Sequence, residues 1–156
     1  MAKWVPGRHM AVIEGDFVVF LIGARINRKR HLVRALRSIG GMQKMLRWLT
    51  EHPEKGLLGF ETAGLTIIQY WRSFDDLEHF ARDESNPHRE VWRRYMQLDS
   101  KRGDAGIWHE TFRVRAGEYE AIYSNIPRRG LAKAGELVPI SGRAETARGR
   151  LGAETG

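Results

Sequence analysis

A six-residue apolar run, 17–22, is the first strong feature of the hydrophobic pattern. Its β-branched and aromatic side chains are typical of a buried strand, which we expect to continue to about Ile26. Apolar positions then recur at helical spacing over about 30–51 and predict a helix with a basic opposite face. Gly40-Gly41 predicts a kink in this helix. His52-Pro53 ends it, because the residue before a proline avoids helical dihedrals.

The middle of the chain alternates between strand and helix patterns. Segments 56–61 and 64–71 are predicted to be the two strands of a hairpin. Ser73 follows them and is a predicted N-cap, since its hydroxyl can accept a bond from a free amide of the first helical turn. Asn86 is the predicted cap of a further helix over 87–98.

Two more strands are predicted towards the C-terminus. Segment 107–114 has strand composition, and 119–123 is a shorter strand after a glycine-containing turn. The order strand, helix, strand, strand, helix, strand favours an α+β fold, a ferredoxin-like βαββαβ sandwich with helices on one face of an antiparallel sheet.

The composition suggests how this fold is bounded along the chain. Pro6-Gly7 breaks regular structure and predicts an N-terminal arm over 1–9. The ferredoxin-like domain is expected over 10–125. Frequent glycines over 126–156 predict an extended C-terminal arm that packs on the domain or on a partner subunit.

The first strand is apolar on both faces, and this predicts an assembly. Its residues alternate between Phe17, Val19 and Leu21 on one face and Val18, Phe20 and Ile22 on the other. Helices cover only one face of a ferredoxin-like sheet. A symmetric homodimer with two sheets face to face, a dimeric α/β barrel, would cover the second face.

Composition excludes several classes of protein. The 156 residues suit one domain, and a 42% hydrophobic and 29% charged composition can form a packed core. The absence of cysteine excludes disulfide scaffolds, thiolate metal sites and cysteine nucleophiles. No window resembles a secretory signal or a membrane span, so a cytoplasmic protein is expected.

The net charge of +7 is concentrated in one segment. Between positions 25 and 47 there is no acidic residue. The eight cations there are Arg25, Arg28, Lys29, Arg30, Arg34, Arg37, Lys44 and Arg47. A solvated helix face is the simplest interpretation, and an anionic small molecule or membrane surface is equally compatible. Nucleic acid is disfavoured, because no zinc-finger spacing, ribonucleoprotein motif or leucine zipper accompanies the charge.

His88 is the most informative ionisable residue. On a helix it shares one face with Val91, Trp92 and Tyr95, so the imidazole is expected to point inward among aromatic rings. It could then act as an axial metal ligand, a general base or a hydrogen-bond donor. The alternative is a buried histidine bonded to a backbone carbonyl, and the sequence leaves both open.

Other polar residues lie on or near the predicted strands. His109 and Glu110 point to opposite faces of one strand and cannot form a dyad. His109 is therefore either a separate catalytic group or a structural sheet residue whose ring nitrogens have hydrogen-bond partners. Asn27 could reach a cleft with its amide or stabilise a turn, and Arg25 could bind an anion or belong to the basic face. Tyr70 is an aromatic strand residue, more often found in a core or an interface than at a ligand.

The chain has none of the common catalytic signatures. Dinucleotide-binding, Walker, nucleophile-elbow and zincin motifs are absent, and His79, His88 and His109 have no standard metal spacing. Any oxidative chemistry would need haem, a bound metal, or a substrate that itself reacts with oxygen.

Several segments together resemble a known family. They are 20–27, 57–60, 69–77, 106–112 and 117–123. They are similar to the bacterial and fungal family named after the small monooxygenase of fumagillin biosynthesis. That family resembles a branch of the dimeric α/β-barrel group, which includes antibiotic-biosynthesis and haem-degrading monooxygenases. The resemblance spans roughly 10–151.

The resemblance implies a site between the sheet and the helices of each subunit. In the haem-degrading branch a strand Asn, a helix Trp and a helix His shape the haem site. Asn27 and His88 fall near the first and last of these, whereas Phe80 stands at the Trp position and Trp92 lies one turn from His88.

The resemblance also implies a function. It predicts a small dimeric monooxygenase-like oxidoreductase that acts on a compact apolar or aromatic molecule, with haem or with no cofactor. The expected catalytic residues are His88, His109 and Asn27, with His88 also the haem or metal ligand. The expected substrate-binding residues are Arg25, Tyr70, Phe80, Trp92 and Tyr95. The alternative is a non-catalytic carrier of haem or another lipophile.

Overall fold

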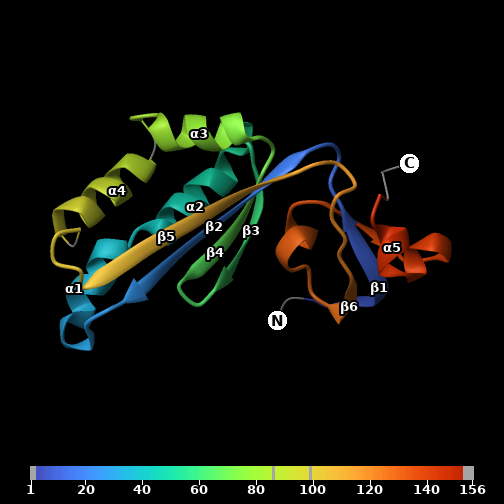
Figure 1. Ribbon diagram of the computed structural model, residues 1–156, viewed down its shortest axis with the longest axis horizontal. Helices are drawn as coiled ribbons and strands as arrows, with labels where there is room; N and C mark the ends of the chain where they lie inside the picture. The colour runs from blue at the N-terminus through green and yellow to red at the C-terminus, as the bar shows by residue number, and fades with distance from the viewer. Residues whose placement is uncertain (1–2, 86, 99, 153–156) are drawn as a thin grey trace.

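Two antiparallel sheets organise the chain in a computed structural model that describes residues 3–85, 87–98 and 100–152 (Figure 1). The strands are β1 (Val5–Val12), β2 (Phe17–Ile26), β3 (Leu57–Ala63), β4 (Thr66–Trp71), β5 (Ala105–Val114), β6 (Tyr123–Ile126) and β7 (Glu136–Pro139). The α-helices are α1 (Leu32–Ile39), α2 (Met42–Glu51), α3 (Phe74–Arg82), α4 (Pro87–Leu98) and α5 (Ala147–Arg150). Short 3-10 helices are η1 (Lys29–His31), η2 (Pro53–Lys55), η3 (Gly130–Lys133) and η4 (Gly142–Glu145).

The larger sheet confirms the mixed α+β prediction. Its strand order is β3-β4-β2-β5, with every neighbouring pair antiparallel. The first and last strands of the βαββαβ unit therefore lie side by side, which is the ferredoxin-like arrangement. The hairpin prediction for β3 and β4 is confirmed, and β2 runs the full length to Ile26.

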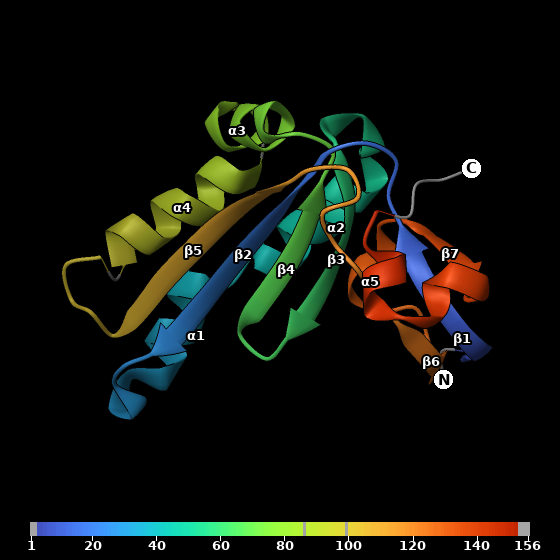
Figure 2. The ribbon, with the colours of Figure 1, turned by 45° about the vertical axis from the view of Figure 1, so that its right-hand side comes forward.

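Helices α1 to α4 cover one face of this sheet (Figure 2). The alternation of β2 places Val18 and Phe20 on that face, where they join a core with Trp71, Leu49 and Phe80. The described part of the chain has no helix long and apolar enough to cross a membrane.

The helix boundaries follow local sequence signals. The predicted kink at Gly40-Gly41 separates α1 from α2, and Gly41 takes a φ of 101° that other residues rarely adopt. A Cβ on Gly41 would also lie 3.1 Å from Val91 of α4, so the glycine permits close packing there. The Ser73 hydroxyl accepts a 3.0 Å hydrogen bond from the Asp76 amide, as expected of an N-cap.

The smaller sheet differs from the sequence-based expectation at both ends of the chain. Strand β1 takes up most of the predicted arm over 1–9 and pairs with β6 and β7 in the order β6-β1-β7. Pro6 is tolerated because the register with β6 shifts between Val5 and Arg8, and pairing with β7 starts only at His9. The strand predicted over 119–123 starts only at Tyr123, and this strand, β6, pairs with β1.

The second face of the larger sheet is covered at one end by the chain itself. Phe17 and Tyr70 on this face pack with Ala11 of β1 and with Leu131 and Ala132 of η3. A Glu61 carboxylate on β3 holds η3 in place. It accepts hydrogen bonds from Arg129 at 2.9 Å and from the Gly130 amide at 3.1 Å, and it pairs with Lys133 at 2.9 Å.

Replacement of Glu61 by glutamine should loosen this attachment and change the acid sensitivity of the protein. Burial alone would raise the pKa of Glu61, but hydrogen bonds from Arg129, Lys133 and Gly130 lower it from 4.5 to about 2. The charged carboxylate therefore stabilises the fold above pH 4.5, and this contribution is lost as the pH falls towards 2.

The expected cost of Glu61→Gln at pH 7 is about 1–2 kcal/mol, because its two cationic partners are partly exposed and screened. Urea unfolding at pH 7 and over the acid range measures it. Glu118→Gln, at an exposed pair with Arg115, is the matched control. Equal stability of the two variants at pH 7 would contradict the role of Glu61.

Candidate functional site

An apolar cavity of about 240 Å³ lies between the larger sheet and its helices. Ile22, Ile67 and Ile107 of the sheet form one side of it, and Leu36, Val91 and Trp92 of α1 and α4 form the other. Because β2, β4 and β5 are neighbours in the sheet, isoleucines from distant parts of the sequence meet on one surface. The cavity suits a compact apolar molecule.

Only a few polar groups reach this cavity. Tyr95, Gln43 and Thr62 line it together with backbone at Gly40-Gly41. The Tyr95 hydroxyl lies 3.5 Å from the Ala105 carbonyl oxygen, a long contact that leaves the hydroxyl able to bind another acceptor. Among the described lining residues, Tyr95 is the one ionisable side chain, so the cavity can orient a ligand but holds no strong base.

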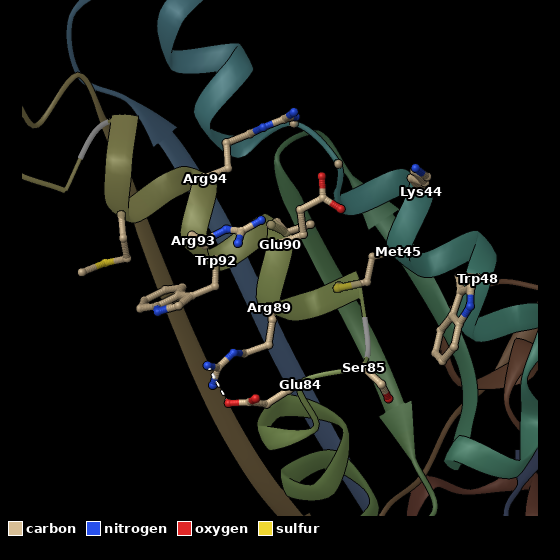
Figure 3. A pocket seen from close by; sticks show the side chains of 14 residues that line it. Lys44, Met45, Trp48, Glu84, Ser85, Arg89, Glu90, Trp92, Arg93 and Arg94 are labelled. Atoms are coloured by element: carbon tan, nitrogen blue, oxygen red, sulfur yellow. Dashed lines mark ion pairs between the residues drawn. The ribbon is translucent and has the colours of Figure 1, made fainter.

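A larger, open cavity of about 970 Å³ adjoins the first (Figure 3). The two share Gly40, Gly41, Val91 and Trp92 as lining residues. The larger cavity also has charged lining residues: Lys44, Glu84, Arg89, Glu90, Arg93 and Arg94. Arg89 pairs with Glu84 at 2.8 Å, and cations outnumber acids in this set. A ligand that enters from this side passes a charged surface before it reaches the apolar cavity.

His88 lies outside both cavities. Its ring packs against Phe80, with centroids 5.8 Å apart, and its Nδ1 is buried with no partner among the described residues. Burial lowers the pKa of His88, partly opposed by the Ala81 carbonyl, so the imidazole is neutral at pH 7. Of the four residues on the predicted helix face, Val91, Trp92 and Tyr95 line the apolar cavity. The fourth, His88, packs against Phe80 of α3 instead.

The other polar residues named from the sequence do not converge on the cavity. His109 is exposed on the helix side of β5, with its ring 5.4 Å from Phe20, and Glu110 lies on the opposite face. The Asn27 amide donates to the Gly103 carbonyl at 3.2 Å, which corresponds to the turn role considered for it. Arg25 is exposed near the end of β2.

Two of the predicted substrate-binding residues are core residues in this structure. Tyr70 lies on the sheet face away from the helices, where burial, with Tyr123 and Glu61 nearby, raises its pKa to about 12. Phe80 is buried between Trp71 and Trp48. Sequence reasoning missed Gln43 and Thr62. The Gly40-Gly41 kink, just before Gln43 in the sequence, was the available signal for Gln43, and Thr62 has no such local signal.

The residues present do not fit a haem held by His88. The His88 ring lines neither cavity. The apolar cavity, at about 240 Å³, is also smaller than the roughly 300–1,000 Å³ of typical ligand pockets, and haem is a large ligand. Over the ranges that the structure covers, no group of three or more His, Asp or Glu side chains could hold a metal ion.

Comparison with known proteins places the chain in a family. A family model described as monooxygenase af470-like matches residues 17–131. The chain belongs to this family. A relative named monooxygenase af470, from Aspergillus fumigatus, is 30% identical over an alignment of 126 residues, and the match covers 72% of this chain and 44% of the relative. The matched segment contains every residue that lines the apolar cavity.

A solved structure shares the fold. The crystal structure of aldoxime dehydratase in complex with butyraldoxime aligns with a TM-score of 0.64 at 16% identity, over 90% of this chain and 43% of that chain. This similarity supports the fold alone. The chain spans less than half the length of both proteins.

Proposed function

We propose that this protein is a monooxygenase-like oxidoreductase whose substrate, a compact apolar or aromatic molecule, binds in the 240 Å³ cavity. The observation that carries the proposal is this apolar cavity within the segment matched by the monooxygenase family. The side chains of Ile22, Ile67 and Trp92 would surround the substrate and exclude water.

The chemistry of such a site is constrained by electron balance. A monooxygenase transfers one atom of O₂ to the substrate and reduces the other to water with two electrons and two protons. The electrons would come from an electron-rich substrate or from an external reductant. Tyr95 is the group at the cavity able to donate a hydrogen bond to a substrate oxygen and so fix its orientation.

A second candidate function is non-catalytic binding of a lipophile. The same cavity supports it, because the residues that line it are mostly apolar and include no strong base. A carrier would bind the molecule and return it unchanged, so analysis of products separates the two functions.

A homodimer is part of the proposal. Trp108 and Phe112 are 42% and 50% exposed on the sheet face that the helices leave open. Trp108 lies against Gly23, where any Cβ would be 2.4 Å from its ring. These rings could pack on a second copy of the chain, and light scattering on wild type and Phe112→Asp would test this.

A cavity-filling variant tests the function. Ala24 lines the cavity, so Ala24→Phe should abolish both ligand binding and turnover while the fold is retained. Ala63→Phe, at an exposed position of β3, is the matched control. Purified protein would be incubated with electron-rich aromatic compounds under ¹⁸O₂, with and without a reductant, and products analysed by mass spectrometry.

The outcomes distinguish the candidates. Labelled product with wild type and Ala63→Phe but not with Ala24→Phe supports the monooxygenase. Binding without product favours the carrier. Equal activity in all three proteins would exclude this cavity as the site. Hemin titration is expected to give no Soret change that depends on His88, and a Soret band lost in His88→Ala would restore the haem hypothesis.

A further inference from the structure

Helix α1 has an unusual exposed surface. Leu32, Val33 and Leu36 are 45%, 69% and 46% exposed, whereas Ala35 is fully buried against the rest of the protein. At 100° per residue the three exposed side chains share one arc of the helix, and Arg37 lies beside them. Most water-facing helix arcs are polar, so this apolar arc needs another explanation.

Basic side chains surround the apolar arc. A cleft of about 400 Å³ is lined by Arg30, His31, Arg34 and Arg37 together with Leu32, Val33 and Leu98. Leu98 ends α4 and is itself 37% exposed. We call these seven residues, together with the exposed Leu36, the α1 patch. The sequence from Arg25 to Arg47 contains no acidic residue. Within the patch, Arg34 pairs with the buried Asp104, and this leaves Arg30 and Arg37 as the cations that the proposal uses.

The patch lies at the end of the molecule farthest from the smaller sheet. Both views show α1 and the C-terminal end of α4 there, away from β1 and β6 (Figures 1 and 2). Leu36 belongs to the exposed arc and also lines the apolar cavity. The arc and the cavity are therefore in contact through one side chain.

We propose that the α1 patch docks onto an anionic lipid surface. Leu32, Val33 and Leu36 would enter the headgroup region, and Arg30 and Arg37 would bind lipid phosphates. This combination of exposed aliphatic side chains and adjacent cations matches a membrane surface better than nucleic acid, whose backbone offers no partner for them. A second copy of the patch would be repelled by its like charge.

The docked orientation would affect how the substrate reaches the apolar cavity. This step rests on the proposed function. A surface-bound protein would hold Leu36, and with it the apolar cavity, at the lipid boundary. Molecules that partition into lipid would then reach the cavity at raised local concentration. Docking itself can be measured without any substrate, so its failure would leave the proposed function standing.

Vesicle sedimentation tests the docking. Wild type should bind vesicles of phosphatidylcholine with 30% phosphatidylserine and not vesicles of phosphatidylcholine alone. Arg30→Glu/Arg37→Glu and Val33→Ser/Leu36→Ser should each lower the partition coefficient by about tenfold or more. Arg148→Glu and Leu151→Ser, exposed residues at or beside α5, are the matched controls and should bind like wild type. Circular dichroism confirms that each variant is folded.

A fluorophore at the patch reports whether the apolar arc enters the lipid. The chain has no cysteine, so Val33→Cys provides a unique position for an environment-sensitive NBD label. Its emission should rise with anionic vesicles, and the same label at Leu151→Cys should not respond. An unchanged Val33 label, or binding to DNA or RNA that only the arginine variant loses, would overturn the proposal.

Discussion

Trp71→Ala is expected to lower the free energy of unfolding by about 3–5 kcal/mol. Trp71 is fully buried at the C-terminal end of β4, where its ring lies 5.5 Å from that of Phe80. Truncation to alanine would leave a large cavity between the sheet and the helices. It would also leave the buried Gln69 side chain without the 2.9 Å hydrogen bond that the Trp71 Nε1 now donates.

Two further variants separate these contributions. Trp71→Phe retains most of the buried apolar surface but removes the donor to Gln69, so a smaller loss of about 1–2 kcal/mol is expected. Trp4→Ala is the exposed control, since Trp4 is 54% exposed, and should change stability by less than about 1 kcal/mol. Urea unfolding measures all three. A cost for Trp71→Ala no greater than for Trp4→Ala would contradict its place at the centre of the core.

The sequence predicted the larger sheet well because its signals are local. The composition of 17–26 predicted strand β2. Gly40-Gly41 predicted the break between α1 and α2, and Ser73 predicted the start of α3. The smaller sheet could not be predicted in this way. Its strands, β1, β6 and β7, come from opposite ends of the chain, and their pairing depends on contacts more than a hundred residues apart in the sequence.

The candidate site was predictable only where one helix determines it. Helical spacing correctly grouped Val91, Trp92 and Tyr95, which meet at the apolar cavity. The same spacing included His88, but the ring of His88 contacts Phe80 because α3 packs over the first turn of α4. Gln43, Thr62 and Ile107 reach the cavity from three other elements, and no periodicity within one segment can indicate such a meeting.

Asp104 connects the sheet to the basic segment and is nearly inaccessible to solvent. Its carboxylate accepts a 3.1 Å hydrogen bond from Arg34 and lies 3.5 Å from Arg28. The Asp104 backbone carbonyl accepts a 2.8 Å hydrogen bond from the backbone N–H of Asn27, so the loop before β5 is fixed to the end of β2. The buried Asp104 carboxylate thus pairs with two of the cations between positions 25 and 47. One of them, Arg28, precedes α1 and the other, Arg34, lies in its first turn, so these contacts position the start of the helix.

Asp104→Ala is expected to lower the free energy of unfolding by about 2–4 kcal/mol. The loss falls below that of a fully buried ion pair because Arg34 and Arg28 are 38% and 51% exposed and can be rehydrated. Asp104→Asn keeps an acceptor for Arg34 and should recover part of the stability. Glu84→Ala removes a carboxylate that is 79% exposed in its pair with Arg89 and should cost less than about 0.5 kcal/mol. Unfolding at low and high salt provides the decisive comparison. Since the Asp104 carboxylate is buried, its effect should persist at high salt, and an effect that disappeared there would show that Asp104 acts only as a surface charge.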